Sequence, residues 1–149
     1  MKRTVASYIE EALSRIADCP AATYRLLDTA GDGFFFHFDS AEGAYRFAAA
    51  LNESTEAHNR EVTDEIAKHW FRTGAATGAV AWSGDKPVGN VVNVCSRHQA
   101  ACAGGDLLID EATHGDLPAA VRGLFGPPET IRDKHGAAYV VRQIGRAHV

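Results

Sequence analysis

The sequence predicts an α+β fold in which helices pack on a sheet that is mostly antiparallel. Three observations favour this class. The first third of the chain carries a strong hairpin signal, stretches with helical spacing alternate with strand-like runs, and no repeat, low-complexity stretch or linker interrupts them. At 149 residues, one domain spanning residues 1–149 is expected, since a fold of this size buries roughly 68–70% of its extended-chain surface. Residues 145–149 are expected to form a flexible tail.

The first predicted elements are a helix and a hairpin. Residues 5–17 place apolar side chains at helical spacing, and Ser7, followed three residues later by a glutamate, can form a capping box. Apolar and aromatic runs at residues 22–27 and 34–38 flank an Asp-Gly turn, which is typical of a β-hairpin. This arrangement places Asp32 at the hairpin tip.

The middle of the chain predicts a second helix followed by strands. The helix is expected to start at Asp39 or Ser40, with apolar residues on one face up to Leu51. It is predicted to fade into the polar stretch 52–68, interpreted as a long exposed loop or a fraying helix end. Residues 70–82, rich in Thr, Val and Gly, predict one or two strands whose glycines allow a bend or a close approach by another backbone.

The rest of the chain completes the alternation of helices and strands. After a turn at residues 83–87 and a short strand at Val88, a third helix is predicted over residues 92–103, ended by the two glycines that follow. The remaining predicted elements are a strand, a short helix and two closing strands, at residues 107–110, 117–125, 130–132 and 138–144.

The charge balance excludes several classes of protein. Fifteen Lys and Arg residues against 19 Asp and Glu give a net charge of −4, and no basic block is present. Because phosphate neutralisation dominates nucleic-acid affinity, nucleic acid is not an expected partner, although a single nucleotide could bind a local cluster. No apolar run reaches the length of about 18 residues that a membrane span needs, and two glutamates interrupt the N-terminal segment where a secretory signal would be apolar. A cytoplasmic protein without membrane contact is expected.

The cysteines and histidines suggest no metal or disulfide framework. The three cysteines form no Cys-x-x-Cys pair, and the seven histidines are scattered without paired metal-ligand spacing. The cysteines are therefore expected to behave as small buried apolar residues in a reducing compartment.

Two clusters of residues could carry chemistry. At the hairpin tip, Asp32 lies between glycines, where an exposed carboxylate can reach a hard cation such as magnesium; a turn aspartate that satisfies its own backbone is the alternative. In the second cluster, a glycine leads into a helix with Asn93 and Arg97 spaced i, i+4, on the same face beside the helix N-terminus. Such a face could hold a ribose oxygen and a phosphate together. The alternative is that Asn93 only caps the helix and Arg97 is solvated.

Taken together, the two clusters resemble the catalytic domain of the class III nucleotidyl cyclases, the adenylate and guanylate cyclase family. The matching segments are DTAGDGFFFHF (28–38), FRTGAATGAV (71–80) and GNVVNVCSRHQAACAGGDLLIDEAT (89–113). The family motifs are a hairpin with Gly-Asp-Gly, a strand with Arg-x-Gly-x-x-x-Gly, and Gly-Asp-x-Val-Asn-x-Ala-x-Arg before a further strand. The resemblance covers roughly residues 22–144 and implies a ferredoxin-like sandwich.

The resemblance implies a role for each matching residue. Asp32 matches a metal-binding aspartate for magnesium or manganese, with Gly31 beside it in substrate binding. Asn93 and Arg97 match the catalytic pair that orients the ribose and stabilises the phosphoryl transition state. Arg132 is a candidate for phosphate binding, as is Lys134. The implied reaction is attack of the ribose 3′ hydroxyl on the α-phosphate of a nucleoside triphosphate with loss of pyrophosphate, at sites shared between the two subunits of a dimer.

Two further positions bear on the choice of base. Asp28 falls where adenine cyclases carry lysine and guanine cyclases carry glutamate, and Lys86 falls roughly where adenine cyclases carry aspartate. In this inverted pair, Asp28 could accept hydrogen bonds from the N1 and N2 hydrogens of guanine, and Lys86 could donate to its O6. Uracil offers a similar donor and acceptor. The alternative is that Asp28 and Lys86 form a surface ion pair of little energetic value.

The sequence departs from the family at its start. The family's opening strand, of the type Phe-x-Asp-Ile-x-Gly, carries another metal-binding aspartate, and no matching segment is found here. With one carboxylate, a two-metal arrangement is incomplete. Three hypotheses follow: a cyclase that acts as a homodimer or with a partner subunit, a degenerate cyclase-like module that binds a nucleotide or regulates a partner, and a dimerisation scaffold without a ligand.

Overall fold

The structure is a computed structural model, and it describes residues 4–30, 33–65, 68–84 and 86–145. These residues divide into two compact units that meet in the chain between Phe71 and Arg72. The predicted single domain over residues 1–149 stays a prediction, and most of the predicted tail at residues 145–149 lies outside the described residues. No helix in the described part of the chain is long and apolar enough to cross a membrane.

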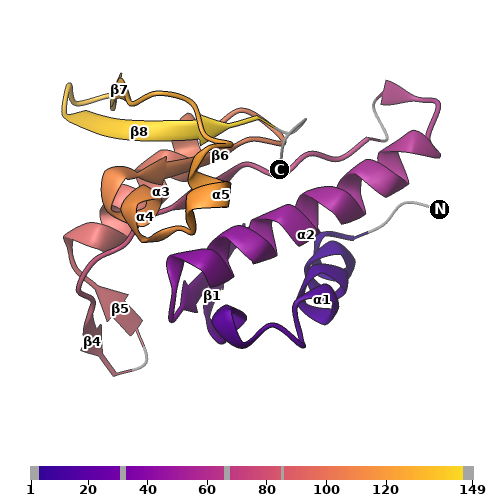
Figure 1. Cartoon of the computed structure of the whole chain (residues 1–149), viewed down its shortest axis with the longest axis horizontal. Helices are drawn as coiled ribbons and strands as arrows, with labels where there is room; N and C mark the ends of the chain where they lie inside the picture. Colours follow the sequence, from indigo (N-terminus) through magenta and orange to yellow (C-terminus); the bar gives the residue numbers. More distant parts are fainter. Residues whose placement is uncertain (1–3, 31–32, 66–67, 85, 146–149) are drawn as a thin grey trace. The chain divides into compact units, whose positions relative to one another are not determined.

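The first unit combines two α-helices with a hairpin (Figure 1). In chain order it contains α1 (Val5–Arg15), the 3-10 helix η1 (Pro20–Ala22), β1 (Tyr24–Ala30), β2 (Gly33–Phe38) and α2 (Ala41–Arg60). Strands β1 and β2 pair antiparallel, with Tyr24 opposite Phe38 and a shift of register between Leu26 and Asp28. The predicted hairpin is therefore confirmed, while its tip lies outside the described residues.

The two α-helices begin at side-chain caps. Thr4 caps α1 by accepting a hydrogen bond from the backbone N–H of Ser7 at 3.1 Å, so the predicted capping box at Ser7 is wrong. Ser40 caps α2 by accepting from the N–H of Gly43 at 3.0 Å, as one of the two predicted starts requires. Ser40 also donates to the carbonyl of Ala21 at 2.7 Å. This contact holds η1 against α2, where a Cβ on Gly43 would lie only 2.2 Å from the Ala21 oxygen.

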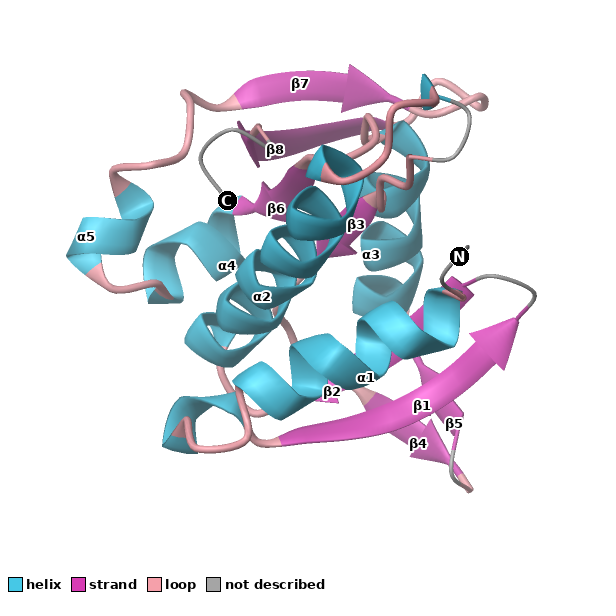
Figure 2. Ribbon diagram, turned by 90° about the vertical axis from the view of Figure 1, so that its right-hand side faces the viewer, coloured by secondary structure: helices cyan, strands magenta, loops and turns pink. Residues whose placement is uncertain are grey.

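The apolar core of the first unit lies between α1 and α2, which run side by side in Figure 2. Phe36 and Phe38 of β2 pack on Phe47 of α2, with ring centroids 4.9 and 5.6 Å apart. The buried members of this core are Tyr8, Ile9, Ala12, Ile16, Ala22, Phe47, Ala50 and Leu51. Burial of this face stabilises both helices, and α1, with 11 residues, would be marginal in water on its own.

The polar stretch after Leu51 continues α2 as a helix up to Arg60, so the predicted loop or fraying end over residues 52–68 is wrong for its first half. Thr55 and Asn59 are buried polar residues of this segment with hydrogen-bond partners, whereas the buried Ser54 hydroxyl has none among the described residues. The Thr55 hydroxyl donates to the Asn52 carbonyl at 3.0 Å. Asn59 binds the backbone of His69 twice, donating to its carbonyl at 2.7 Å and accepting from its N–H at 2.9 Å. These bonds remove the cost of burying polar side chains.

The second unit is a four-stranded sheet with helices. Its elements are β3 (Thr73–Ala75), β4 (Ala81–Ser83), β5 (Lys86–Val88), α3 (Asn90–Ala101), β6 (Leu107–Asp110), α4 (Glu111–Asp116), α5 (Ala119–Arg122), β7 (Glu129–Arg132) and β8 (Ala138–Ile144). The strand order is β3-β6-β8-β7, in which only the β3–β6 pair is parallel, and β4 and β5 form a separate antiparallel ribbon. The predicted α+β class with mostly antiparallel strands is confirmed.

Helix α3 packs on the edge strand β3 (Figure 2). It begins after Gly89, whose φ of 131° suits glycine alone, and ends at Ala101. The helix therefore starts and ends two residues earlier than predicted, because the chain turns at Cys102 before the glycine pair. Cys102 donates from its thiol to the Asp106 carbonyl at 3.0 Å, which closes the turn between α3 and β6.

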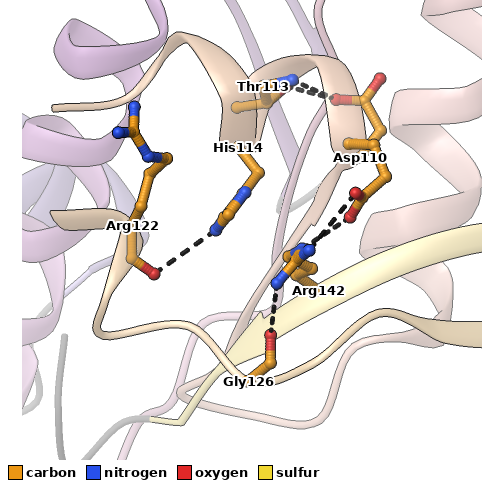
Figure 3. A network of polar contacts seen from close by, with 7 residues as sticks. Asp110, Thr113, His114, Arg122, Gly126 and Arg142 are labelled. Atoms are coloured by element: carbon orange, nitrogen blue, oxygen red, sulfur yellow. Dashed lines mark hydrogen bonds and ion pairs between the residues drawn. The ribbon is translucent and has the colours of Figure 1, made fainter. Parts of the chain in front are cut away.

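Polar contacts tie the short helix α4 to the sheet, and His114 of α4 lies 3.4 Å from the carbonyl oxygen of Arg122 in α5 (Figure 3). Asp110 caps α4 by accepting from the N–H of Thr113 at 2.9 Å. Arg142 of β8 binds the Glu111 carboxylate at 2.6 Å and donates to the carbonyl of Gly126. The short helix predicted over residues 117–125 is present as α5 but is shorter, because proline disfavours helical geometry in the residue before it and Leu117, before Pro118, is extended.

Candidate functional site

One open groove in the second unit collects several of the residues singled out from the sequence. It has a volume of about 570 Å³ and lies between α3 and the turn that joins β7 to β8. Helix α3 contributes Asn93, Ser96 and Arg97, and the β7–β8 segment contributes Arg132, Asp133, Lys134 and Tyr139. The predicted i, i+4 pair Asn93 and Arg97 thus lines one side of a single groove.

The guanidinium of Arg97 is held by an ion pair. Its Nη1 lies 3.0 Å from Oδ2 of Asp133, and its Cζ lies 5.9 Å from the ring centroid of Tyr139. The Arg97 side chain is 37% exposed, whereas that of Asp133 is 9% exposed. Since a guanidinium carries five N–H donors in a planar fork, one carboxylate oxygen leaves most of them for other acceptors.

The carboxylate of Asp133 is fixed by its own turn. Its Oδ1 accepts from the backbone N–H groups of His135 at 2.8 Å and Ala137 at 3.0 Å, and its Oδ2 accepts from the Tyr139 hydroxyl at 3.4 Å. Desolvation acts to raise the pKa of Asp133, but these two N–H groups, the Arg97 charge and the Tyr139 hydroxyl together hold that pKa below its usual value. Asp133 is therefore ionised at neutral pH.

The other side of the groove carries cationic side chains. Arg132 donates from Nη1 to the carbonyl of Gly136 at 3.2 Å, which closes the β7–β8 turn, and Lys134 lines the groove beside it. The groove therefore combines three cations, Arg97, Arg132 and Lys134, with the single carboxylate of Asp133. The balance favours an anionic ligand.

The remaining predicted site residues do not belong to this groove. Lys86 is exposed on β5, in register with Ser83. Asp28 lies in β1 opposite Phe35, and only its backbone is described. Gly31 and Asp32 lie outside the described residues. Within the described ranges, no three His, Cys, Asp or Glu side chains gather where they could hold a metal ion.

The sequence did not single out Ser96, Asp133 or Tyr139 of the groove, and Asp133 is the one of these that forms an ion pair with Arg97. Its neighbours Arg132 and Lys134 were candidates because they are cationic, but nothing in the local sequence indicates that the carboxylate between them meets Arg97, which lies 36 positions earlier (133 − 97). An Asp followed by Gly three residues later does predict a turn, and this is the one signal that was available.

Comparison with known proteins identifies the fold. No family model and no curated protein matches this sequence. Among solved structures, the adenylate/guanylate cyclase/hydrolase from Silicibacter pomeroyi superposes with a TM-score of 0.71 at 22% identity, over 91% of this chain and 76% of that one. An adenylate cyclase from Trypanosoma brucei in its monomeric state has a TM-score of 0.63 at 17% identity, over 94% and 76%. The guanylyl cyclase Cya2 has a TM-score of 0.57 at 16% identity, over 94% and 79%.

This chain has the class III cyclase fold. The resemblance inferred from three short sequence segments is thus confirmed at the level of the fold, over most of the chain. In this chain α3 carries Asn93 and Arg97 at i, i+4 spacing, and the groove beside it also contains Arg132.

Proposed function

We propose that this chain is a class III nucleotidyl cyclase domain, which converts a nucleoside triphosphate to a 3′,5′-cyclic nucleotide and pyrophosphate. The observation that carries the proposal is the groove of the second unit. In a chain with the cyclase fold, it joins Asn93 and Arg97 on one helix face to the cations Arg132 and Lys134. This is the combination that a ribose carrying a polyphosphate requires.

The proposed chemistry follows from these side chains. The Asn93 amide donates to an oxygen of the ribose and orients its 3′ hydroxyl. The 3′ oxygen forms a bond to the α-phosphorus as the bond to the bridging oxygen of pyrophosphate breaks, and the hydroxyl proton is released. Arg97 donates to the α-phosphoryl oxygens, on which negative charge develops, and Arg132 with Lys134 binds the departing pyrophosphate. Phosphoryl transfer depends mostly on such positioning and charge stabilisation.

The proposal includes magnesium or manganese and a second copy of the chain. Asp32 is the proposed metal ligand, and the metal ion would neutralise charge on the phosphates. Since the resemblance implies that the metal ligands and the Asn–Arg pair come from different subunits, we expect the active form to be a homodimer or a complex with a partner subunit. Asp28 and Lys86 are the proposed base-reading residues, with guanine or uracil favoured over adenine.

Turnover of three nucleotides tests this function. The full chain is incubated with GTP, UTP or ATP in the presence of Mg²⁺ or Mn²⁺, and cyclic product and pyrophosphate are measured. We expect Arg97→Ala to lower turnover about 10²- to 10³-fold, as the loss of one transition-state donor does. Arg60→Ala, which removes an exposed arginine at the end of α2 and outside the groove, is the matched control. The proposal fails if no nucleotide is turned over by the unmodified protein under any of these conditions.

A second candidate function is that of a nucleotide-binding module without turnover. The observation that favours it is the Arg97–Asp133 ion pair, because a guanidinium neutralised by a carboxylate stabilises a phosphoryl transition state less well. This function predicts that GTP or UTP raises the melting temperature of the protein while no cyclic product forms. In that case Asp32→Ala changes nucleotide binding, and no cyclic product is measured with either protein.

A further inference from the structure

We infer that Asp133 is a built-in counter-ion which an anionic ligand must displace from Arg97. This inference deepens the proposed function and rests on it, since it takes the groove to be the place where the phosphates of a nucleotide bind. It assigns a regulatory role to a residue of the β7–β8 turn rather than to α3.

The Asp133 carboxylate is the more firmly held partner of the ion pair. Oδ1 of Asp133 accepts two backbone hydrogen bonds, at 2.8 and 3.0 Å from His135 and Ala137, and the backbone of Asp133 is itself bonded across the turn to Ala137 and Gly136 at 3.0 Å. The side chain therefore cannot swing away without breaking the turn. It is also 9% exposed, against 37% for the Arg97 side chain.

Arg97 is the less firmly held partner of the ion pair. The only polar partner described for its guanidinium is Oδ2 of Asp133, in an ion pair at 3.0 Å, and the Tyr139 ring lies at the distance limit of a cation–π contact, 5.9 Å. When Arg97 turns toward a ligand, Oδ2 keeps the Tyr139 hydroxyl and Oδ1 keeps both backbone donors. After this exchange the Asp133 carboxylate still has hydrogen-bond partners. The exchange therefore avoids the free-energy cost of a buried carboxylate without partners.

The charge of the groove gives the direction of the effect. With Asp133 ionised, Arg97 is neutralised and Arg132 and Lys134 remain as the uncompensated cations of the groove lining. Removing the carboxylate charge frees Arg97 for the ligand and removes a repulsion. Asp133→Asn makes this change while keeping an acceptor oxygen for the two backbone N–H groups of the turn. Asp133 is thus a positioning residue that lowers the affinity of the groove for phosphates.

Binding of inorganic triphosphate tests the inference by calorimetry. We expect Asp133→Asn to bind triphosphate about threefold to tenfold more tightly than the unmodified chain. Asp116→Asn, an exposed residue at the end of α4 outside the groove, makes the same change in net charge and serves as the control. In an Arg97→Gln background, the gain from Asp133→Asn should fall to that of Asp116→Asn. An Asp133→Asn variant that folds and gains no more than Asp116→Asn overturns the inference, as does a gain that is independent of Arg97.

A second measurement uses the unmodified chain and does not depend on a variant that folds. The side-chain carboxyl carbon of Asp133 and the guanidinium of Arg97 are followed by NMR as triphosphate is added. Displacement predicts that both signals shift together; a shift of Arg97 with an unchanged Asp133 carboxyl shows that the anion adds without displacement and overturns the inference. Because the probe is triphosphate, this result is independent of nucleotide turnover. A chain that shows this exchange but turns over no nucleotide would refute the proposed function and still support the counter-ion role of Asp133.

Discussion

The backbone of Gly74 in β3 lies so close to that of Gln99 in α3 that a Cβ on Gly74 would come within 2.3 Å of the Gln99 nitrogen. Cys95 adds a second backbone contact, with its carbonyl oxygen 2.9 Å from the same position. The close approach that the glycines of residues 70–82 predicted is confirmed here. It fixes the helix that presents Asn93 and Arg97 to the groove.

The first prediction concerns this contact. Gly74→Ala should lower the free energy of unfolding by about 3 kcal/mol, because the added methyl meets backbone atoms that cannot rotate away. Urea denaturation measures the effect. Gly115→Ala is the control, since Gly115 lies in α4 with open space around it and the change should alter stability by less than about 1 kcal/mol. Equal stabilities of the two variants would contradict the close packing of β3 on α3.

The ion pair between Glu111 and Arg142 predicts a pH dependence of stability. The hydrogen bond from Arg142, together with its charge, lowers the pKa of Glu111 below its usual value of 4.5. A lowered pKa in the folded state contributes stability above the unfolded-state pKa, and this contribution is lost as the pH falls through the folded-state pKa. The melting temperature of the unmodified chain should therefore exceed that of Glu111→Gln near pH 7, and the difference should shrink as the pH falls below 4.5.

Salt provides the control for the pH experiment. The Glu111 side chain is 48% exposed, so added salt should reduce the difference between the two proteins at pH 7. A difference that stays constant from pH 7 to pH 3 would show that Glu111 stabilises α4 by a means other than its charge.

Much of the fold could be predicted because its signals are local. The strand Leu107–Asp110 was predicted residue for residue, since an apolar run bounded by two glycines and an aspartate has few other interpretations. The strand Ala138–Ile144 was predicted for the same reason. Helix α4 was missed because six residues, EATHGD, carry no apolar periodicity; it depends on the cap at Asp110 and on the contact of Glu111 with Arg142.

One physical reason explains why the sequence predicted neither the second half of α2 nor the contact of Asp133 with Arg97. The stability of each depends on partners that are distant in sequence or on hydrogen bonds that leave no apolar pattern. Asn59 is ordered by the backbone of His69, and Asp133 meets Arg97 across 36 positions (133 − 97). Spacing along one helix, by contrast, correctly put Asn93 and Arg97 in the same groove.

The buried thiols predict an order of chemical reactivity. Burial raises the pKa of Cys95 to about 11, with Asp110 adding to the effect, and burial likewise raises the pKa of Cys102 to about 11. The thiolate is the reactive form, so both should react slowly with an aromatic disulfide reagent at pH 8 in the folded protein. Cys19 and Cys95 are both partly exposed, but Cys19 lines an open pocket of the first unit and should account for the fast phase, which Cys19→Ser should abolish. Three fast thiols in the folded chain would contradict the raised pKa of Cys95 and Cys102.

The last prediction tests the choice of base, and it concerns Asp28 and Lys86. If these residues read the base as proposed, exchanging them as Asp28→Lys with Lys86→Asp restores the pattern of the adenine cyclases and should shift the preference from GTP or UTP toward ATP by about tenfold or more in kcat/KM. The change in preference, rather than in overall rate, is the measurement, because a loss of stability lowers the rate with all three nucleotides alike. Lys68→Asp, a charge reversal in another part of the chain, should leave the preference unchanged. A preference of the unmodified chain for ATP would contradict the proposal that Asp28 and Lys86 select guanine or uracil.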